Sequence, residues 1–150
     1  MDISQWSRGI LKSWKNHSLS PEFEKAPAGG RFCEVAGFGT LDEKINHYDD
    51  ASHEIGWSAK GKKLPGFVSG LQNQLKVEKI DEGHCRITSN ISADLTGIMG
   101  LVMGSYIRKN FTKQIGVFLK DCKTYAETGE VSEAKKKGEG KERRAIVIRD

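Results

Sequence analysis

A few polar side chains that could do chemistry stand on predicted strands whose other residues alternate between apolar and polar. Glu43 follows Leu41 by two positions and precedes Ile45 by two, so the three side chains are predicted to share one strand face. Their apolar character makes this the inward face, and a carboxylate is costly to bury unless it is paired or protonated. The sequence leaves three readings open for Glu43: contact with a ligand, a salt bridge, or a solvated position.

His53 is the second candidate acid or base. It precedes Ile55 and Trp57 on the same predicted face and could donate a proton or a hydrogen bond to something held inside. The alternative is a histidine that caps or flanks the start of a strand at the surface. Glu43 and His53 are therefore the catalytic candidates if the protein is an enzyme.

Ser69, Asn73 and Ser89 lie among apolar residues, and each needs a hydrogen-bonding partner if it is buried. Water or one another would suffice. The chain has no Gly-x-Ser-x-Gly elbow for a hydrolytic triad and no phosphate-binding glycine loop. His17 and the other histidines share no spacing with cysteines or carboxylates that would form a metal site, so we predict neither a metal nor another cofactor.

Period-two alternation predicts the strands that position these residues. Ile55, Trp57 and Ala59 alternate on one predicted strand, and similar patterns continue through residues 67–77 and 87–91. We expect five strands in an antiparallel meander, at about residues 31–36, 38–48, 52–59, 67–80 and 84–91. Ahead of them, Ile10, Leu11 and Trp14 have near-helical spacing, so a short helix is predicted within residues 3–14.

From about Ile98 the apolar period changes from two to near 3.6, which predicts one long amphipathic helix ending at Thr128 and Gly129. Its apolar stripe is predicted to face the sheet and comprises Gly104, Ile107, Phe111, Ile115, Phe118, Cys122 and Tyr125. The fold class is therefore α+β, with a curved antiparallel sheet wrapped around a long C-terminal helix and an internal apolar cavity.

Bulk composition fits one domain over residues 1–130 of the 150-residue chain. Cys33, Cys85 and Cys122 have no paired spacing, so we read them as buried thiols. The N-terminus lacks a secretory signal, and no apolar run is long enough to cross a bilayer, so a cytoplasmic location without integral membrane association is expected. Residues 131–150 hold much of the net charge of +4 and are predicted to be a disordered basic tail, within which residues 145–148 are strand-like. We assign the tail no nucleic-acid partner.

Several segments in order resemble the START-like, or Bet v 1-like, superfamily (SRPBCC), which includes polyketide cyclase/dehydrases and lipid-transport proteins. The similar segments are residues 3–7 (ISQWS), 39–45 (GTLDEKI) followed by 48–50 (YDD), 56–58 (GWS), 64–67 (LPGF) and the closing helix. The resemblance implies a helix-grip fold. By analogy, Glu43 would be a pocket carboxylate, Trp57 and Phe67 pocket aromatics, and Leu64 with Pro65 part of a mobile gate loop.

The resemblance has one departure, because members of this superfamily normally begin with a strand and a short helix ahead of the segment similar to residues 3–7. A sheet without that strand would expose unpaired backbone groups and apolar surface. A homodimer, with or without exchanged strands, is the resulting expectation.

The leading functional prediction is a noncatalytic protein that binds or transports a small hydrophobic molecule, such as a lipid, polyketide, isoprenoid or aromatic metabolite. The alternatives are an enzyme of cyclase, dehydrase or isomerase type that uses Glu43 or His53, and a protein-interaction module. The predicted ligand-binding residues are Glu43, Ile55, Trp57, Ala59, Leu64, Pro65, Phe67, Ser69, Leu71, Asn73, Ile87, Ser89, Ile107, Phe111 and Ile115.

Overall fold

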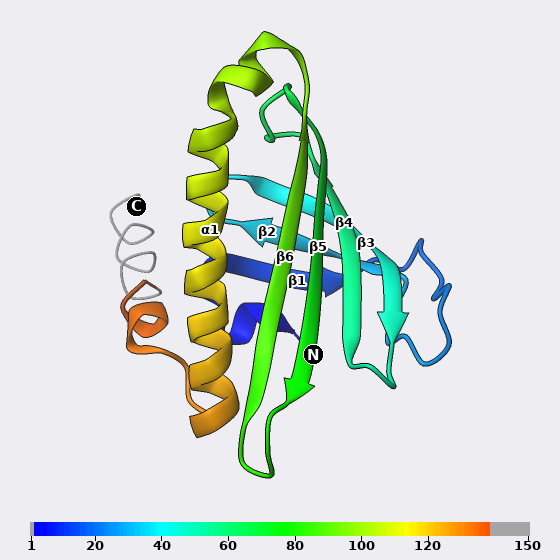
Figure 1. Cartoon of the computed structure of the whole chain (residues 1–150), viewed down its shortest axis with the longest axis vertical. Coiled ribbons are helices and arrows are strands. Elements are labelled where there is room, and N and C mark those ends of the chain that lie inside the picture. The colour runs from blue at the N-terminus through cyan, green and yellow to red at the C-terminus, as the bar shows by residue number, and fades with distance from the viewer. Residues whose placement is uncertain (1, 139–150) are drawn as a thin grey trace, which may run out of the picture.

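The computed structural model describes residues 2–138 and consists of one antiparallel sheet and one long helix (Figure 1). The bounds are η1 (Ile3–Gln5), β1 (Ile10–Lys15), β2 (Gly30–Val35), β3 (Gly39–Asp49), β4 (Glu54–Gly61), β5 (Val68–Lys79), β6 (Cys85–Leu95) and α1 (Gly97–Thr128). This arrangement confirms the predicted α+β, helix-grip-like fold class.

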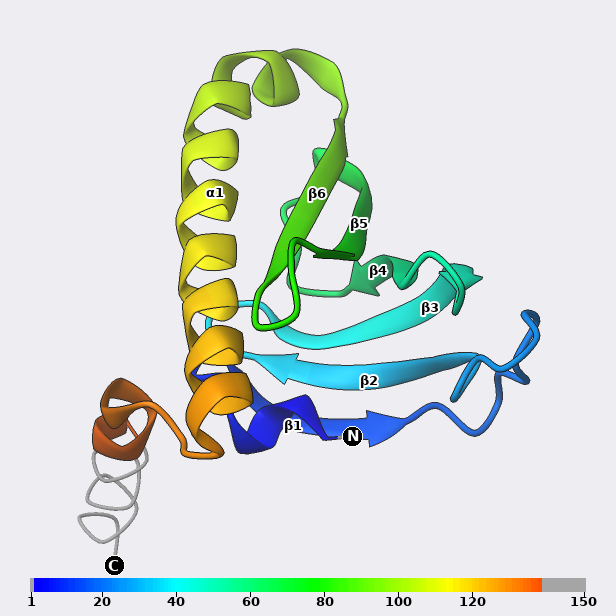
Figure 2. The ribbon, with the colours of Figure 1, turned by 60° about the horizontal axis from the view of Figure 1, so that its bottom comes forward.

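The sheet is a meander with the strand order β1-β2-β3-β4-β5-β6, so every strand pairs with its neighbours in sequence. It is curved and does not close into a barrel, and α1 runs beside its concave side (Figure 2). At 1.5 Å per residue, the 32 residues of α1 span roughly 48 Å, which lets one helix line the whole sheet.

The pairing register confirms most of the predicted alternation. Trp57 pairs with Asn73, which pairs in turn with Ile91, so these three side chains form one row across the concave face. A second row lies beside the first: Ile55 pairs with Leu75, and Leu75 pairs with Ser89. Directly paired residues of antiparallel strands share a face, so this row also lies on the concave side.

Ser69 is where the alternation fails. The β5–β6 register shifts between Val68 and Gly70, so Ser69 lies at the irregularity with an exposed side chain. Its hydroxyl donates a 3.2 Å hydrogen bond to the backbone oxygen of Asp94. A bulge adds one residue to a strand and thereby reverses the face of the residues before it, which a strict period of two cannot anticipate.

The predicted helix over residues 3–14 is wrong for most of that range. Only Ile3–Gln5 are helical, and they form a 3-10 turn, whereas Ile10–Lys15 form the edge strand β1. The segment forms a strand in spite of its helical spacing because β1 pairs with β2 along its length. This pairing places the ring centroid of Trp14 5.7 Å from that of Phe32. The sheet therefore has six strands, one more than predicted.

A compact apolar core lies at the β1 end of the sheet. Trp6 is 6 % exposed, and its ring centroid lies 5.1 Å from that of Phe118 and 6.3 Å from that of Tyr125, both on α1. Beside this core, the fully buried carboxylate of Asp121 accepts hydrogen bonds from the guanidinium and backbone N–H of Arg8. The N-terminal segment thus fastens the second half of α1 to the sheet.

The predicted apolar stripe of α1 is confirmed, because every one of its residues is half-buried while most of the helix is exposed. The helix also ends as predicted: Gly129 adopts φ 71°, and its N–H donates to the carbonyl oxygen of Tyr125 at 2.9 Å.

The prediction of three buried thiols has a mixed outcome. Cys33 is buried, but Cys122 is half-buried and Cys85 is exposed, because it stands at the hairpin end of β6. Residues 133–138 of the predicted tail are helical and lie against the body, where the side chain of Ser132 donates a hydrogen bond to Asp121 at 2.9 Å. The rest of that tail, including residues 145–148, lies outside the described residues.

Candidate functional site: a gap between helix and sheet

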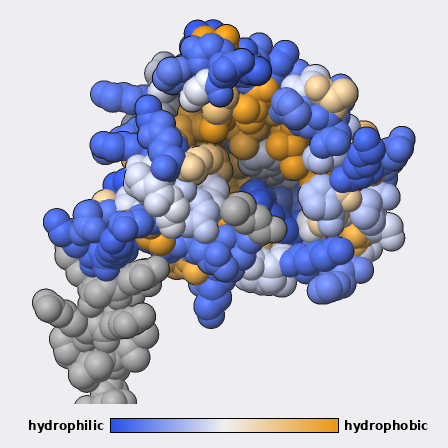
Figure 3. Space-filling model, turned by 90° about the horizontal axis from the view of Figure 1, so that it is seen from below, coloured by the Kyte–Doolittle hydropathy of each residue, from blue (hydrophilic) through white to orange (hydrophobic). Residues whose placement is uncertain are grey.

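The first half of α1 and the edge strand β6 do not meet completely and leave between them a cavity of about 610 Å³ that is open to solvent. Figure 3 shows the hollow from below, with apolar surface on its walls and a polar rim. Its apolar wall combines Ile91, Ala93 and Leu95 of β6 with Ile107, Phe111 and Ile115 of α1. Cavities of roughly 300 to 1,000 Å³ with such walls are typical sites for small molecules.

Phe38 extends the helix side of this gap. It follows β2 in the tight connection to β3, and its ring stacks on that of Phe111 at a centroid distance of 6.3 Å and an interplanar angle of 14°. Offset aromatic stacking of this kind holds both rings in place. A segment far from α1 in sequence thereby fixes one wall of the gap.

The concave face also carries one ion pair, between Arg31 of β2 and Glu43 of β3. The Nε of Arg31 donates to the Oε2 of Glu43 at 2.5 Å, and the two residues are paired directly in the register. The guanidinium carbon lies 5.5 Å from the ring centroid of Trp57, within range of a cation–π contact. Of the three readings that the sequence left open for Glu43, the structure places it in a salt bridge.

Cys33 completes this cluster and is held in its protonated form. Its thiol donates to the Oε2 of Glu43 at 3.5 Å, and its side chain has no solvent exposure. Burial and the neighbouring Glu43 carboxylate raise the pKa of Cys33 to about 11, although the Arg31 guanidinium and the hydroxyl of Ser13 act in the opposite direction. A thiol with such a high pKa is a poor nucleophile at neutral pH.

A second cavity of about 320 Å³ opens beside the Arg31–Glu43 pair. Trp57 lines this cavity, and Ile91, which stands in the same cross-strand row, lines the larger gap. Between them, the buried Asn73 accepts a hydrogen bond from the hydroxyl of Ser89 at 2.8 Å. The concave face is therefore one surface with a polar, charged end and an apolar end.

Most of the predicted ligand-binding residues belong to this surface. Glu43 and Asn73 are buried on it, and the predicted helix residues line the larger gap. The sheet residues whose register places them on it are Ile55, Trp57, Ala59, Leu71, Ile87 and Ser89. Sequence alternation thus brought together side chains from four strands and one helix.

The remaining predicted residues lie elsewhere. Leu64 and Pro65 stand in the loop between β4 and β5, where Leu64 is half-buried and Pro65 is exposed. Phe67 ends that loop, half-buried, and its carbonyl oxygen accepts a 2.8 Å hydrogen bond from the backbone N–H of Thr96. Ser69 is exposed at the bulge described above.

His53 differs from its predicted position. It lies in the turn between β3 and β4 with φ 54° and an exposed side chain, and its carbonyl oxygen accepts a hydrogen bond from Val77. The turn takes it out of the alternation that begins at Ile55, so it does not share the concave face with Trp57. The alternative reading, a surface histidine at the start of a strand, matches this position.

Sequence reasoning missed most residues that line the second cavity, and Arg31, Ser13 and Lys15 are the polar ones on β1 and β2. The sequence pattern could have identified Arg31, because it stands two residues before the buried Cys33 on a predicted strand and therefore shares the inward face of that strand. No comparable pattern pointed to Ser13 and Lys15, since the segment that forms β1 was predicted to be helical.

The described residues hold no cluster of three or more histidine, cysteine or acidic side chains that could bind a metal ion. Within the same part of the chain, no helix combines the length and apolar character needed to cross a bilayer. The arrangement offers shape, apolar surface and the cations of Lys15, Arg31 and Arg108, which are means of noncovalent binding.

Comparisons with known proteins show the fold and no more. No protein-family model matches the chain, and no curated protein is similar to it. Two solved structures are similar: an uncharacterised protein from Bacillus thuringiensis, with a TM-score of 0.56 at 10 % identity over 77 % of each chain, and the protein XoxI from Bacillus cereus. The latter has a TM-score of 0.54 at 10 % identity, over 77 % of this chain and 75 % of its own. At this identity, the similarity shows that the sheet and helix share an arrangement with both proteins.

Proposed function

We propose that the protein binds a small hydrophobic molecule in the gap between β6 and the first half of α1. The observation that carries the proposal is the cavity of about 610 Å³, whose lining includes apolar side chains from both the sheet and the helix. Apolar burial would supply the affinity, at about 25 cal/mol per Å² before the costs of binding. The resemblance to START-like proteins supports the same function, and we propose membership of that superfamily together with it.

The polar end of the concave face would orient such a ligand. Arg31 already has Glu43 as a partner through its Nε, so its outer nitrogens are the donors that could reach a polar ligand group. Asn73 accepts from Ser89 and still carries an amide N–H₂ that can donate. The ion pair gives Glu43 a structural role, so we favour binding over acid–base catalysis.

Fluorescence of the apolar dye 1-anilinonaphthalene-8-sulfonate tests this function. The double variant Ala93→Phe/Ile107→Trp adds bulk to both walls of the gap and should weaken dye binding about tenfold or more. Ala126→Trp is the matched control, because it adds a Trp at an exposed position of the same helix, away from the gap, and should leave binding unchanged. Equal dye binding by the double variant and the unmodified protein would rule out this gap as the site.

A further inference from the structure

The first three turns of α1 present large apolar side chains to solvent. Ile98 is 82 % exposed, Leu101 85 % and Val102 69 %, and Met99 and Tyr106 are more than half exposed. Contiguous exposed apolar surface on an otherwise polar molecule marks an interaction site. We name this set the apolar tip; it consists of Ile98, Met99, Leu101, Val102 and Tyr106.

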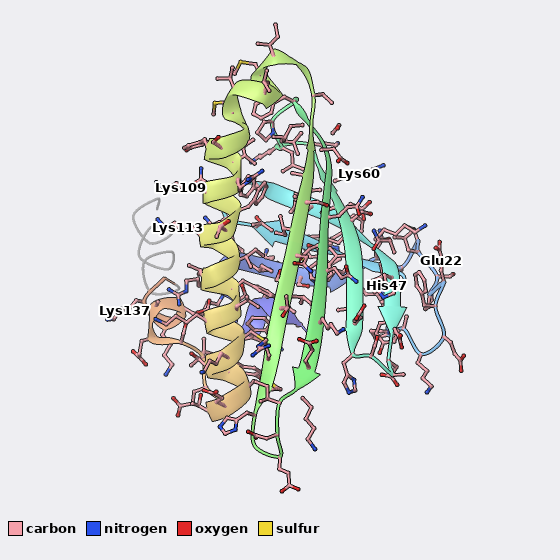
Figure 4. All side chains as sticks on the ribbon, viewed as in Figure 1. Glu22, His47, Lys60, Lys109, Lys113 and Lys137 are labelled. Carbon is pink, nitrogen blue, oxygen red and sulfur yellow. The ribbon has the colours of Figure 1, made fainter. Side chains whose placement is uncertain are left out.

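Basic side chains surround the apolar tip. On α1, Arg108 and Lys109 follow Tyr106 closely, and Lys109 lies about 10 Å, or two helical turns, along the helix axis from Val102. Figure 4 shows Lys109 and Lys113 projecting from the side of α1 that faces away from the sheet. Between Thr96 and Lys120, the chain contains no acidic residue.

The β4–β5 loop adds more cations at the same end of the molecule. Residues 62–67 (KKLPGF) form this loop and include two lysines and no acid, and Lys60 stands just before it on β4. The hydrogen bond from the backbone N–H of Thr96 to the carbonyl of Phe67 joins the end of the loop to the start of α1. Figure 1 shows this loop and the start of α1 together at one end of the sheet. Asp94 is the one acidic residue that closely precedes α1, so the net charge of this end of the molecule remains positive.

We propose that the apolar tip and its basic surroundings dock onto an anionic phospholipid bilayer. Exposed apolar side chains would enter the boundary between headgroups and acyl chains, while the lysines pair with lipid phosphates and carboxylates above them. A second copy of the chain fits this surface less well, because a two-fold contact would bring like charges together. Docking requires no ligand in the gap, so this proposal and the proposed function can fail independently.

Flotation with lipid vesicles tests the proposal. The unmodified protein should float with vesicles in which phosphatidylserine replaces about a third of the phosphatidylcholine and bind pure phosphatidylcholine vesicles far more weakly. Raising the salt concentration should release it, because screening weakens the attraction of the lysines. Binding to neither kind of vesicle, or binding that salt leaves unchanged, would overturn the proposal.

Paired variants separate the apolar from the charged contribution. Ile98→Ser/Leu101→Ser should weaken vesicle binding about tenfold or more. Ile80→Ser should leave it unchanged, because this exposed apolar residue stands in the β5–β6 hairpin, at the other end of the sheet. Lys62→Glu/Lys109→Glu should weaken it about 25-fold or more, because each lysine near the surface contributes about fivefold. Circular dichroism verifies that the variants are folded.

The control variants also define the results that would contradict the docking proposal. Lys79→Glu/Lys120→Glu changes the net charge equally but away from the apolar tip, so an equal loss of binding in this control would make the effect nonspecific and overturn the site. A concentration-dependent dimer that Ile98→Ser/Leu101→Ser abolishes, in a protein that does not float with vesicles, would assign the apolar tip to a second copy instead.

Discussion

The two halves of α1 follow the same apolar spacing but meet the sheet in different ways. In the anchored half, residues 116–128, Phe118 and Tyr125 pack on Trp6, and Asp121 binds Arg8. In the open half, residues 97–115, the inward side chains line a cavity. One sequence period therefore produces a packed core where the N-terminal segment supplies partners and a potential binding site where partners are few.

The largest expected effect is that of Trp6→Ala, which removes the partner of the anchored half. Replacing a buried large aromatic residue by alanine typically costs about 3–5 kcal/mol, because transfer energy is lost and a cavity remains. Trp6 is 6 % exposed, and urea titration should find a loss in this range. Trp14→Ala is the matched control and should cost far less, since Trp14 is 45 % exposed.

A second pair of substitutions compares the two halves directly. Phe118→Ala should lower the free energy of unfolding by about 3 kcal/mol, because its ring packs on Trp6. Ile107→Ala should cost about 1 kcal/mol, because its side chain faces an existing cavity and leaves few contacts behind. Equal losses in urea titration would mean that the open half is packed after all.

The Arg8–Asp121 pair should make the anchored half sensitive to acid. Burial opposes ionisation of Asp121, but hydrogen bonds from Arg8 and Ser132 outweigh it, and the pKa of the carboxyl falls below its ordinary value of 3.8. A lowered pKa in the folded state means that the stabilisation is present above pH 3.8 and is lost as the pH falls through the folded-state value.

Asp121→Asn should therefore destabilise the protein at neutral pH by about 2–3 kcal/mol, since it leaves the partly buried Arg8 without its counter-ion. As the pH falls from 3.8 through the lower folded-state pKa of Asp121, the difference from the unmodified protein should shrink, because the unmodified protein then loses this carboxylate as well. Urea titrations at neutral and acid pH measure this. Glu127→Gln, at an exposed position of the same helix, is the control and should show no comparable pH dependence.

The same contrast explains how far the sequence alone could go. Alternation predicted the concave row through Trp57, and helical spacing predicted the inward stripe of α1, because both depend only on local geometry. The edge strand β1 was missed because its conformation depends on pairing with β2, and Ser69 was misplaced because a bulge reverses the face.

The partner of Glu43 was beyond a local reading as well. Arg31 lies opposite it only through the β2–β3 register, which a sequence pattern does not specify without knowledge of the connecting turn. Similarly, nothing in the spacing of Ile107 and Phe118 distinguishes a side chain that faces a cavity from one that packs on Trp6. That difference arises from residues distant in the chain.

The smallest expected effects concern two glycines that test whether α1 is held at both ends of the gap. A Cβ on Gly116 would meet nothing within 4 Å, so Gly116→Ala should stabilise the protein by about 0.5–1 kcal/mol through helix propensity. A Cβ on the buried Gly100 would approach Leu95 to 3.0 Å, so Gly100→Ala should forfeit that gain or destabilise. Thermal unfolding of both variants distinguishes the cases. If both stabilise equally, α1 is free of the sheet at its start; if only Gly116→Ala does, close approach at Gly100 and the Trp6 core hold the two ends of a helix that spans the gap between them.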